Sequence, residues 1–552
     1  MPHQPPASDD APDPYAGRWV ARLKGQVIGQ GGTPEQAQQA AKASRFKERP
    51  KVTYMATTQA LSFSPLLEQV RSILENHKQI YLAGGAVRDA LLQRVSHDLD
   101  FAVAGDALKL ARKVANALGG AYYRLDDEHQ TGRVILNQSD GSRYLLDFAK
   151  FRGDGIDADL RGRDFTLNAI AVDIKNPQEL LDPLGGLADL YARKLRACSA
   201  TTFADDPLRI LRAIRFAASY GLHILPDART AMRASVELIP QVSPERVRDE
   251  LFRILDAPKP AASLRALEML GALPEALPDL AALKDVEQSP PHVYDVWEHT
   301  LQTLGFLEKI YRVLTDEHDP DKVGDLYFGL IVMRLGRYRP QLRAHLAEQL
   351  NRERSLRALL FFAALYHDIA KPQTHSTGED GRIRFIDHEN QGALIAEARA
   401  AALRFGTAES ERLVAIVRHH MRPHHLAHAA QPPTRRAIYR FFRDTGEAGI
   451  DVCLLSLADL LATYAAILPR ERLEAQLDVV RALLEAYWEQ KEETVSPPAL
   501  MDGKDLSKEF DLTEGPNIGA ILETIREGQA AGDVTTRGDA LQLAEEWLAD
   551  NR

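Results

Sequence analysis

One change of pattern along the chain limits the folds that it can adopt. Between residues 61 and 190, short apolar strands alternate with helices, as in the successive runs QIYLAGG, VRDALLQR and DLDFAV. Alternation of this kind is typical of layered α and β structure. From about residue 203 onward, nearly every segment has the periodicity of a helix. We therefore expect an α+β fold, with a mixed sheet and helices in the head and only helices after it.

Length, charge and cysteine usage narrow the class further. The chain has 552 residues and a net charge of −10, which indicates several domains and argues against a protein that coats nucleic acid. It has two cysteines and no signal-peptide pattern at its start, and we expect no apolar run to be long enough to span a bilayer. The expected setting is a reduced cytoplasm, with no membrane partner.

The first part of the chain differs from the rest. Residues 1–16 are rich in Pro, Asp and Ala and are expected to be disordered. The alternating run WVARLKGQVIGQGG predicts a hairpin, and the Thr-Pro pair that follows it predicts the start of a helix. These signals predict a small β-β-α appendage over about residues 17–58, without a catalytic constellation.

The clearest chemical pattern is the pair Asp98 and Asp100 on a predicted strand. Because side chains two residues apart in a strand share a face, both carboxylates point to one side and repel unless a cation lies between them. Paired Mg²⁺ ions at such a site activate an attacking 3′-OH and stabilise charge on the reacting phosphate. The alternative is a solvated acidic strand on the surface.

Two further features fit a phosphoryl-transfer site. Gly84 and Gly85 stand between a predicted strand and a predicted helix, where backbone N–H groups can cradle a triphosphate. A purely structural turn explains the glycine pair equally well. Asp147 lies in the apolar run RYLLDFAKF and can lie beside the first two carboxylates in a sheet, as a third ligand of the metal that activates the hydroxyl.

Several motifs in this region resemble one family. GGAVRDALLQRVSHDLDFAV resembles the polymerase-β-type nucleotidyltransferases, and more closely the bacterial class II tRNA nucleotidyltransferases (CCA-adding enzymes) and their poly(A) polymerase relatives. In order, RGRDFTLNA resembles the family's ribose-selecting segment, LLDPLGGLADL its DPxGGxxDL segment, ADDPLRILRAIRF its nucleotide-reading EDxxR segment, and SPERVRDEL the next neck helix. The motifs cover about residues 70–256. The chain departs from the family pattern at Gly162, often Arg, and at Asp205, often Glu.

The resemblance implies roles for single residues in the head. Asp98, Asp100 and Asp147 would be catalytic, and the first two would hold two Mg²⁺ ions. The implied nucleotide-binding residues are Gly84, Gly85, Arg88, Arg163, Asp164, Asn168, Asp206, Arg209 and Arg212. Among these, Arg163, Asp164 and Asn168 suit a ribose 2′-OH, and their alternative role is a polar network that holds a turn.

Asp206 and Arg209 share one face at the start of a predicted helix. ATP and CTP both present a ring-nitrogen acceptor beside an amine donor, which an arginine and a carboxylate match, whereas GTP and UTP present the opposite pattern. The residues alone favour a helix cap for Asp206 before Pro207, and the resemblance favours the nucleotide role.

A second constellation is dispersed over the helical part. An adjacent His-Asp pair, His367 and Asp368, lies in an apolar helix, where a carboxylate is costly unless it is paired or bound to metal. The order of histidines and aspartates resembles HD-domain phosphohydrolases, which occur fused to CCA-adding heads. The resemblance implies a site for Mg²⁺ or a divalent transition metal with the ligands His299, His367, Asp368 and Asp459, and with His388 and His420 nearby.

Two alternatives accompany the HD interpretation. An HD shell can persist as a scaffold without catalysis. In the His-rich run 419–428, we expect His424, His425 and His428 to be exposed or near RNA phosphates.

The resemblance also implies an order of domains and a function. The expected parts are an appendage (1–60), a nucleotidyltransferase head (61–190), a helical neck that reads the base (191–256), a body (257–295), an HD domain (296–470) and a tRNA-binding tail (471–552). The expected function is addition of CCA, from CTP and ATP, to the 3′ end of tRNA, together with metal-dependent phosphohydrolysis. The alternatives are addition of CC or A alone, a poly(A) polymerase, and an HD phosphohydrolase with an inactive head.

Overall fold

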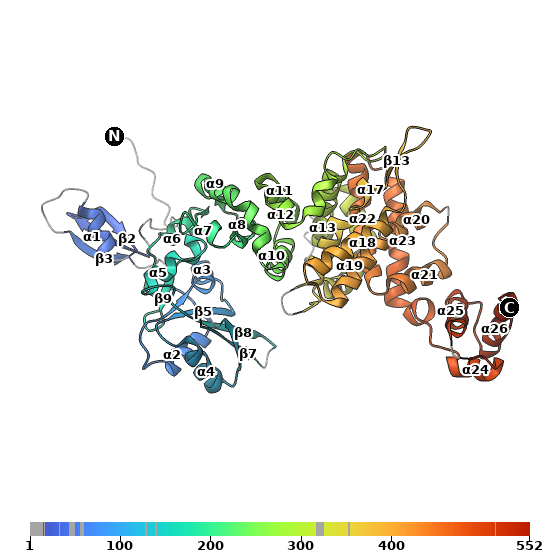
Figure 1. The fold of residues 1–552 in the computed structure, drawn as a ribbon, viewed down its shortest axis with the longest axis horizontal. Helices are drawn as coiled ribbons and strands as arrows, with labels where there is room; N and C mark the ends of the chain where they lie inside the picture. Colours follow the sequence, from blue (N-terminus) through green and yellow to red (C-terminus); the bar gives the residue numbers. More distant parts are fainter. Residues whose placement is uncertain are drawn as a thin grey trace. The chain divides into compact units, whose positions relative to one another are not determined.

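The computed structural model describes residues 15, 17–32, 34–42, 50–55, 60–126, 130–138, 141–315, 325–351, 354–429, 431–513 and 515–551. The chain divides into two compact units, Met1–Leu238 and Ile239–Arg552 (Figure 1). The first unit combines sheets and helices, and the described part of the second is helical apart from one short hairpin. The predicted α+β class is confirmed.

A small sheet forms the start of the described chain. The structure contains the predicted hairpin, β1 (Arg18–Leu23) and β2 (Gln26–Gly31), and the predicted helix, α1 (Pro34–Lys42). It adds a third strand, β3 (Lys51–Met55), which pairs with β1 and gives the order β2-β1-β3. Strand β3 was not predicted, because this short strand pairs with a partner that is distant in the sequence. The predicted disorder of residues 1–16 falls almost entirely outside the described residues.

The head is built on a seven-stranded mixed sheet. Its strand order is β10-β9-β4-β5-β8-β7-β6. Strands β5 and β8 run parallel, whereas their other neighbours in the sheet pair antiparallel. In chain order the strands are β4 (Ile80–Ala83), β5 (Asp98–Val103), β6 (Ala121–Asp126), β7 (Thr131–Asn137), β8 (Arg143–Lys150), β9 (Ala171–Asp173) and β10 (Leu180–Leu181).

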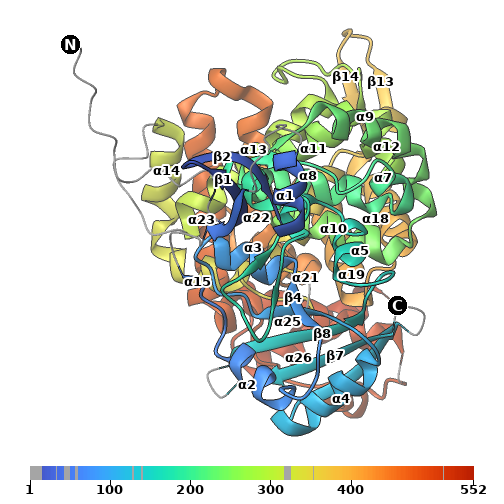
Figure 2. The ribbon, with the colours of Figure 1, turned by 90° about the vertical axis from the view of Figure 1, so that its left-hand side faces the viewer.

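Alternation along β5 separates a core face of the sheet from a chemical face. Leu99 and Phe101 are buried, and Phe101 stacks on Phe148 of β8 with ring centroids 4.7 Å apart. Helices α2 (Leu66–Ile73) and α4 (Ala107–Leu118) lie along this side of the head (Figure 2). Because successive strand residues point to opposite faces, Asp98 and Asp100 lie on the other face.

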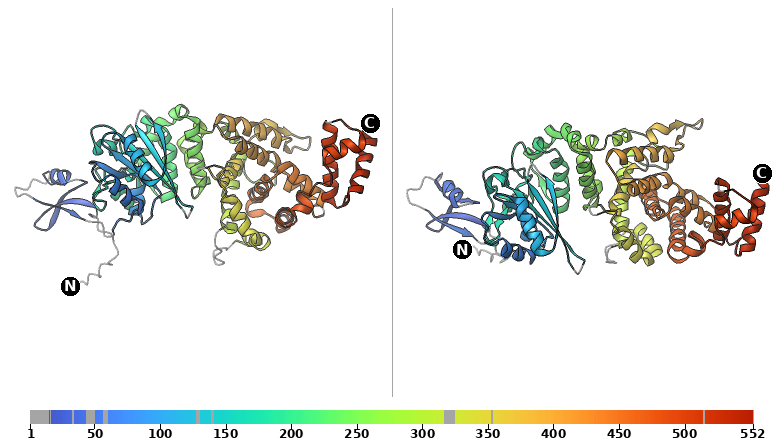
Figure 3. Two further views of the ribbon diagram at one scale, coloured as in Figure 1. Left: turned by 90° about the horizontal axis from the view of Figure 1, so that it is seen from below. Right: turned by 60° about the horizontal axis from the view of Figure 1, so that its bottom comes forward.

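Helices that carry predicted site residues follow in both units. In the first unit, η1 (Thr166–Asn168) and α8 (Leu208–Tyr220) stand near the sheet. The second unit is a packed set of helices (Figure 3). Those that matter for its site are α13 (Val296–Thr315), α16 (Leu356–Tyr366), α18 (His388–Ala402), α19 (Thr407–His419), α20 (Arg422–His428) and α22 (Ala448–Tyr464).

Helix α22 corrects one expectation about apolar runs. The segment Ala448–Ile467 is long and apolar enough to cross a membrane by length and composition. However, 72% of its apolar window is buried inside the protein, and it carries Asp451 and Asp459. A helix that is apolar all round and covered by other helices is typical of the core of a large domain, so α22 is the central helix of the second unit.

Candidate functional site

Three carboxylates meet on the chemical face of the head sheet. Asp100 lies directly opposite Asp147 in the parallel register of β5 and β8, and Asp98 lies two residues before Asp100 on the same face. Asp98 is exposed and Asp100 is half-buried. Burial raises the pKa of Asp100 to about 6, Arg163 opposes that rise, and the charges of Asp147 and Asp98 add to it. Burial and mutual repulsion oppose ionisation of these carboxylates, and a divalent cation such as Mg²⁺ would stabilise their charged form.

Asp147 also has a cationic partner. Arg133 of β7 lies opposite it and makes a two-pronged ion pair, in which Nε donates to Oδ1 at 2.8 Å and Nη2 donates to Oδ2 at 2.7 Å. The third carboxylate is therefore already neutralised by an arginine in this structure.

Gly84 lies at the junction of strand β4 and helix α3 (Gly85–Leu91), next to the carboxylates. Its φ is +79°, a conformation that favours glycine. A Cβ at this position would lie 2.7 Å from Nη1 of Arg163 and 3.5 Å from Oδ2 of Asp100. A side chain here would therefore displace Arg163 and fill the space beside Asp100.

Two of the three predicted ribose-binding residues, Asp164 and Asn168, lie in one hydrogen-bonded network, whereas Nε of Arg163 donates to Oδ2 of Asp159 at 3.2 Å. Nη2 of Arg212 donates to Oδ2 of Asp164 at 2.6 Å, and Nδ2 of Asn168 donates to Oδ1 of Asp164 at 3.0 Å. Nη1 of Arg88 donates to Oδ1 of Asn168 at 2.7 Å. Burial alone would raise the pKa of Asp164, but Arg212 and the hydrogen bond from Asn168 hold it below its ordinary value. The network keeps Asp164 ionised and fixes the turn, as the alternative interpretation of these residues requires.

Asp206 and Arg209 lie together at the start of α8. Nε of Arg209 is 3.9 Å from Oδ2 of Asp206, and the Arg209 side chain is only 12% exposed. Oδ1 of Asp206 accepts a hydrogen bond from the Leu208 backbone N–H at 3.3 Å, a contact of the capping kind. Nη2 of Arg209 donates to the Gly162 carbonyl at 3.0 Å. Arg209 thus braces the turn that carries the ribose network and does not face solvent.

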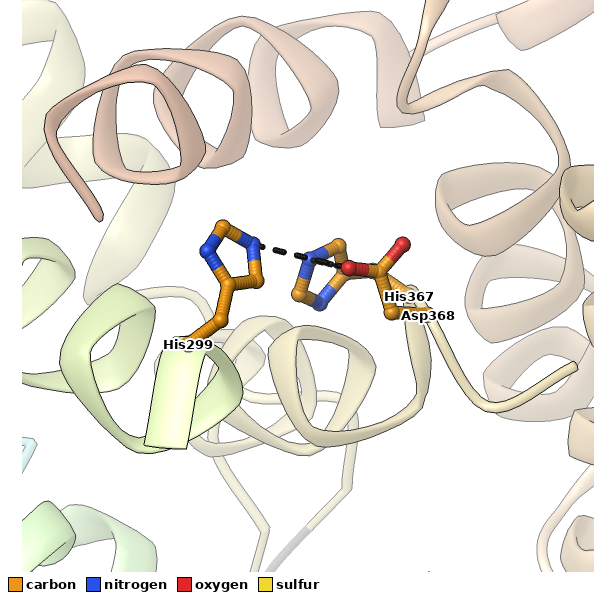
Figure 4. A group of neighbouring side chains, drawn as sticks. All are labelled: His299, His367 and Asp368. Carbon is orange, nitrogen blue, oxygen red and sulfur yellow. Dashed lines mark ion pairs between the residues drawn. The ribbon is translucent and has the colours of Figure 1, made fainter. Parts of the chain in front are cut away.

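The helical unit brings its predicted metal ligands to one point. His299 of α13 lies 3.0 Å (Nε2) from Oδ1 of Asp459 on α22 and 3.5 Å from Oδ2 of Asp368. His367 directly follows α16, and its Nε2 lies 3.2 Å from Oδ2 of Asp368. Figure 4 shows the His299 and His367 rings and the Asp368 carboxylate pointing toward one another. Ligand atoms of His299, His367 and Asp368 all lie within 4.8 Å of each other.

Asp368 also belongs to a second group of ligand atoms. Its Oδ1 lies 3.4 Å from Nε2 of His388 and 3.9 Å from Nε2 of His420. The Nε2 atoms of those two histidines are 3.3 Å apart. One carboxylate that is shared by two clusters, one on each oxygen, provides places for two cations.

Backbone hydrogen bonds orient three of these histidines. Nδ1 of His367, His388 and His420 lies 2.8, 2.8 and 2.7 Å from the carbonyl oxygens of Ala364, Phe385 and Val417, respectively. Because a carbonyl only accepts, each Nδ1 carries a proton, and in the neutral ring this leaves the Nε2 lone pair toward the centre. This tautomer is the one that binds a metal ion.

Electrostatics agree with a cation at this centre. Burial lowers the pKa of His420 well below its ordinary value, which keeps its ring neutral. Burial alone would raise the pKa of Asp368, but His367 and Lys371 hold it well below its ordinary range. Nε2 of His367 is buried without a hydrogen-bond partner, and Oδ2 of Asp368 has ion-pair neighbours, so the residues fit a bound divalent metal.

Two functional residues of this centre were missed in the sequence. His424, which we expected to be exposed or near RNA phosphates, is instead buried, and its Nε2 lies 2.9 Å from Oδ2 of Asp459. Its place depends on how α20 packs against α22, which no local pattern reports. Lys371 lies 2.7 Å from Oδ2 of Asp368, and its spacing of three residues from that aspartate was the available signal.

Known families match most of the chain. Residues 80–196 match a model described as the poly A polymerase head domain, residues 221–284 match the probable RNA and SrmB-binding site of polymerase A, and residues 341–464 match the HD domain. These matches contain the acidic strand of the head and most of the helical metal centre.

Individual relatives match over almost their full length. The A-adding tRNA nucleotidyltransferase of Deinococcus radiodurans is 31% identical over 485 residues, which cover 85% of this chain and 95% of the relative. The CC-adding tRNA nucleotidyltransferase of Geobacter sulfurreducens is 31% identical, with 85% and 92% covered. A solved complex of a CCA-adding enzyme with CTP has the same fold, with a TM-score of 0.54, 20% identity, and 88% and 95% covered. The chain therefore belongs to the tRNA nucleotidyltransferase and poly(A) polymerase family, and its nucleotidyltransferase head is followed by an HD domain.

Proposed function

We propose that this chain adds CMP and then AMP residues to the 3′ end of tRNA, without a template, to give CCA. The observation that carries the proposal is the acidic face of β5 and β8, where Asp98, Asp100 and Asp147 lie together. Mg²⁺ ions held by Asp98 and Asp100 would lower the pKa of the tRNA 3′-OH and stabilise charge on the reacting α-phosphate. We infer that Asp147 joins them as the third ligand.

The other head residues would position the incoming nucleotide. We infer that the Gly84–Gly85 turn admits the triphosphate, since a side chain at Gly84 would fill the space beside Asp100. Arg163, Asp164 and Asn168 would meet the ribose, with Asn168 held by Arg88 and Asp164 held by Arg212. Asp206 and Arg209 would read the base. The ribose would thus be selected by the turn and the base by the start of α8. The hydrogen bond from Arg209 to the Gly162 carbonyl joins these two parts.

Partial addition is the second candidate, and the names of the relatives favour it. Four relatives that each cover 85% of this chain are named for adding only A or only CC. Three tRNA transcripts, ending before C74, before A76 and after A76, separate the possibilities when CTP and ATP are supplied alone and together. Full CCA addition predicts that CTP extends the first transcript by two residues and ATP extends the second by one. A CC-adding enzyme would leave the second transcript unextended, and an A-adding enzyme would leave the first.

Arg209→Ala is expected to impair nucleotide choice more than metal chemistry. If Arg209 donates to the ring nitrogen of ATP and CTP, its loss removes a charge-assisted hydrogen bond worth roughly 1.5–3 kcal/mol, or about 10- to 150-fold in kcat/KM. The weak use of GTP and UTP should fall less. The kcat/KM values for the four triphosphates on one tRNA measure this, with the exposed Arg229→Ala as the matched control. An equal loss for all four nucleotides would mean that Arg209 only braces the Gly162 turn.

We further propose that the HD domain is a metal-dependent phosphohydrolase for phosphate esters or 2′,3′-cyclic phosphates. Support comes from the two ligand groups that share Asp368. The metal would polarise the phosphate and lower the pKa of a bound water. His299, His367, Asp368 and Asp459 would hold it, as Mg²⁺ or a transition metal, and His388, His420 and His424 would complete the surroundings. The division into parts at residues 60, 190, 256, 295 and 470, with a tRNA-binding tail, and a cytoplasmic location belong to the same proposal.

A further inference from the structure

The chemical face of the head sheet continues past the acidic cluster to the sheet edge. Asp100 lies opposite Asp147, Asp147 lies opposite Arg133, and Arg133 lies opposite Tyr123 of the edge strand β6. Residues that lie opposite one another in a sheet share a face. Since neighbouring strands are about 4.8 Å apart, the row from Asp100 to Tyr123 is roughly 14 Å long. We call these four residues the acid-to-edge row.

The outer half of the acid-to-edge row is accessible. Tyr123 is 47% exposed, and the side chains of Arg133 and Asp147 are 27% and 21% exposed. The opposite face of the same strands packs on α4, so Val134 and Leu146 are fully buried there. An arginine and an exposed tyrosine therefore stand side by side on the open face.

The other side of Asp100 is already committed to the incoming nucleotide in the proposed function. There Nη1 of Arg163 and Oδ2 of Asp100 lie 2.7 and 3.5 Å from the place where a Cβ on Gly84 would stand. Strand β4, which ends at Gly84, and strand β8, which carries Asp147, flank β5 on opposite sides. Two substrates that react at the carboxylates must approach from different directions. The side of β8, β7 and β6 is the one left for the tRNA end.

We propose that Arg133 and Tyr123 form a binding site for the last nucleotides of the tRNA, which we call the 3′-end site. Arg133 binds a backbone phosphate, and the Tyr123 ring stacks on an unpaired base near the 3′ end. An arginine for phosphate and an aromatic ring for a base are the usual means of holding single-stranded RNA. A length of roughly 14 Å accommodates about two nucleotides between the reacting 3′-OH and Tyr123.

The ion pair of Arg133 with Asp147 suggests how the 3′-end site binds a phosphate. In the structure the guanidinium neutralises Asp147 through two hydrogen bonds. A cation bound at the carboxylates would compete for Asp147 and leave the guanidinium to a phosphate. Arg133 is therefore a positioning residue that exchanges one anion for another, and the inference rests on the proposed tRNA function.

Separate measurements of KM for tRNA and of KM for CTP and ATP test the 3′-end site. We expect Arg133→Ala and Tyr123→Ala each to raise KM for tRNA by about 10-fold, with KM for CTP and ATP changed less than twofold. Tyr123→Phe keeps the stacking ring and should restore the wild-type KM. Arg133→Ala should also lower the salt slope of equilibrium tRNA binding, measured without nucleotide, by about 0.7.

Arg124→Ala is the matched control. Arg124 is exposed, lies next to Tyr123 on β6 and points to the opposite face, so its loss removes the same charge from the same strand. Thermal melting of every variant checks that the head still folds, and Arg133→Lys, which keeps the charge, covers the case in which Arg133→Ala melts early. A raised KM for CTP or ATP in Arg133→Ala would assign this arginine to the triphosphate and overturn the proposal.

Equal effects of Arg124→Ala and Arg133→Ala would also overturn it, because a general charge effect would then suffice. A different result would contradict the proposed function. If the wild type adds no nucleotide to any tRNA, that function is wrong. If the wild type is active and Arg133→Ala and Tyr123→Ala have the wild-type KM for tRNA, only the proposed 3′-end site is wrong.

Discussion

Asp98→Ala and Asp100→Ala are each expected to lower the rate of nucleotide addition by at least about 10³-fold. Each substitution removes a proposed metal ligand, and a metal ion contributes several kcal/mol of transition-state stabilisation, where about 4 kcal/mol corresponds to 10³-fold. Folding should be affected little, because Asp98 is exposed, and because burial, with a smaller contribution from Asp147 and Asp98, raises the pKa of the half-buried Asp100 to about 6.

The measurement is single-turnover extension of a tRNA that lacks its 3′ end, at saturating Mg²⁺, with thermal melting of each variant. Asp154→Ala is the matched control, since it removes an exposed carboxylate from the same part of the chain. Near-wild-type extension by Asp98→Ala or Asp100→Ala would show that the acidic strand is not the catalytic metal site.

Asp368→Ala is expected to abolish metal-dependent phosphohydrolysis and to leave nucleotide addition within about twofold of wild type. Asp368 is the one carboxylate that both ligand groups of the HD domain share, so its loss removes a ligand from each. The head carboxylates belong to the other compact unit of the chain, which is the reason to expect separate effects.

Hydrolysis of a 2′,3′-cyclic nucleotide and of a phosphate monoester, with Mg²⁺, Mn²⁺, Ni²⁺ and Co²⁺ in turn, measures the first effect. Asp380→Ala removes an exposed carboxylate from the same domain and serves as the control. Equilibrium dialysis of the metal provides a readout that does not depend on turnover. An inactive wild type that still binds metal through Asp368 would identify a structural centre, and unchanged hydrolysis by Asp368→Ala would contradict the assignment.

The strong local patterns predicted the central strands of the head, and the weak ones were missed. β4, β5, β7 and β8 follow apolar or alternating runs that a sequence displays directly. β6 has the sequence AYYRLD and is largely exposed, because an edge strand has one neighbour and need not alternate. The strand that completes the acid-to-edge row was therefore not predicted, like the short strands β9 and β10.

Some contacts between side chains could likewise be predicted from the sequence, and others could not. The spacing of Asp98 and Asp100 already requires one face, so the acidic pair follows from strand geometry alone. The pairing of Arg133 with Asp147 depends on the register of two strands, and the contact of His424 with Asp459 depends on the packing of two helices. Neither register nor helix packing can be read from residue types near each position, so these partners required the structure.

Sequencing of tRNA 3′ ends, after incubation with all four triphosphates, shows which nucleotides the protein adds and where addition stops. The three transcripts are mixed with wild-type protein and Mg²⁺, and each product end is read. If the protein adds CCA with the metal ions held by Asp98 and Asp100, we expect that only C and A are added, that the transcripts stop at CCA, and that Asp100→Ala adds nothing. Incorporation of G or U at comparable frequency, growth of a long A tail, or unchanged ends would contradict it.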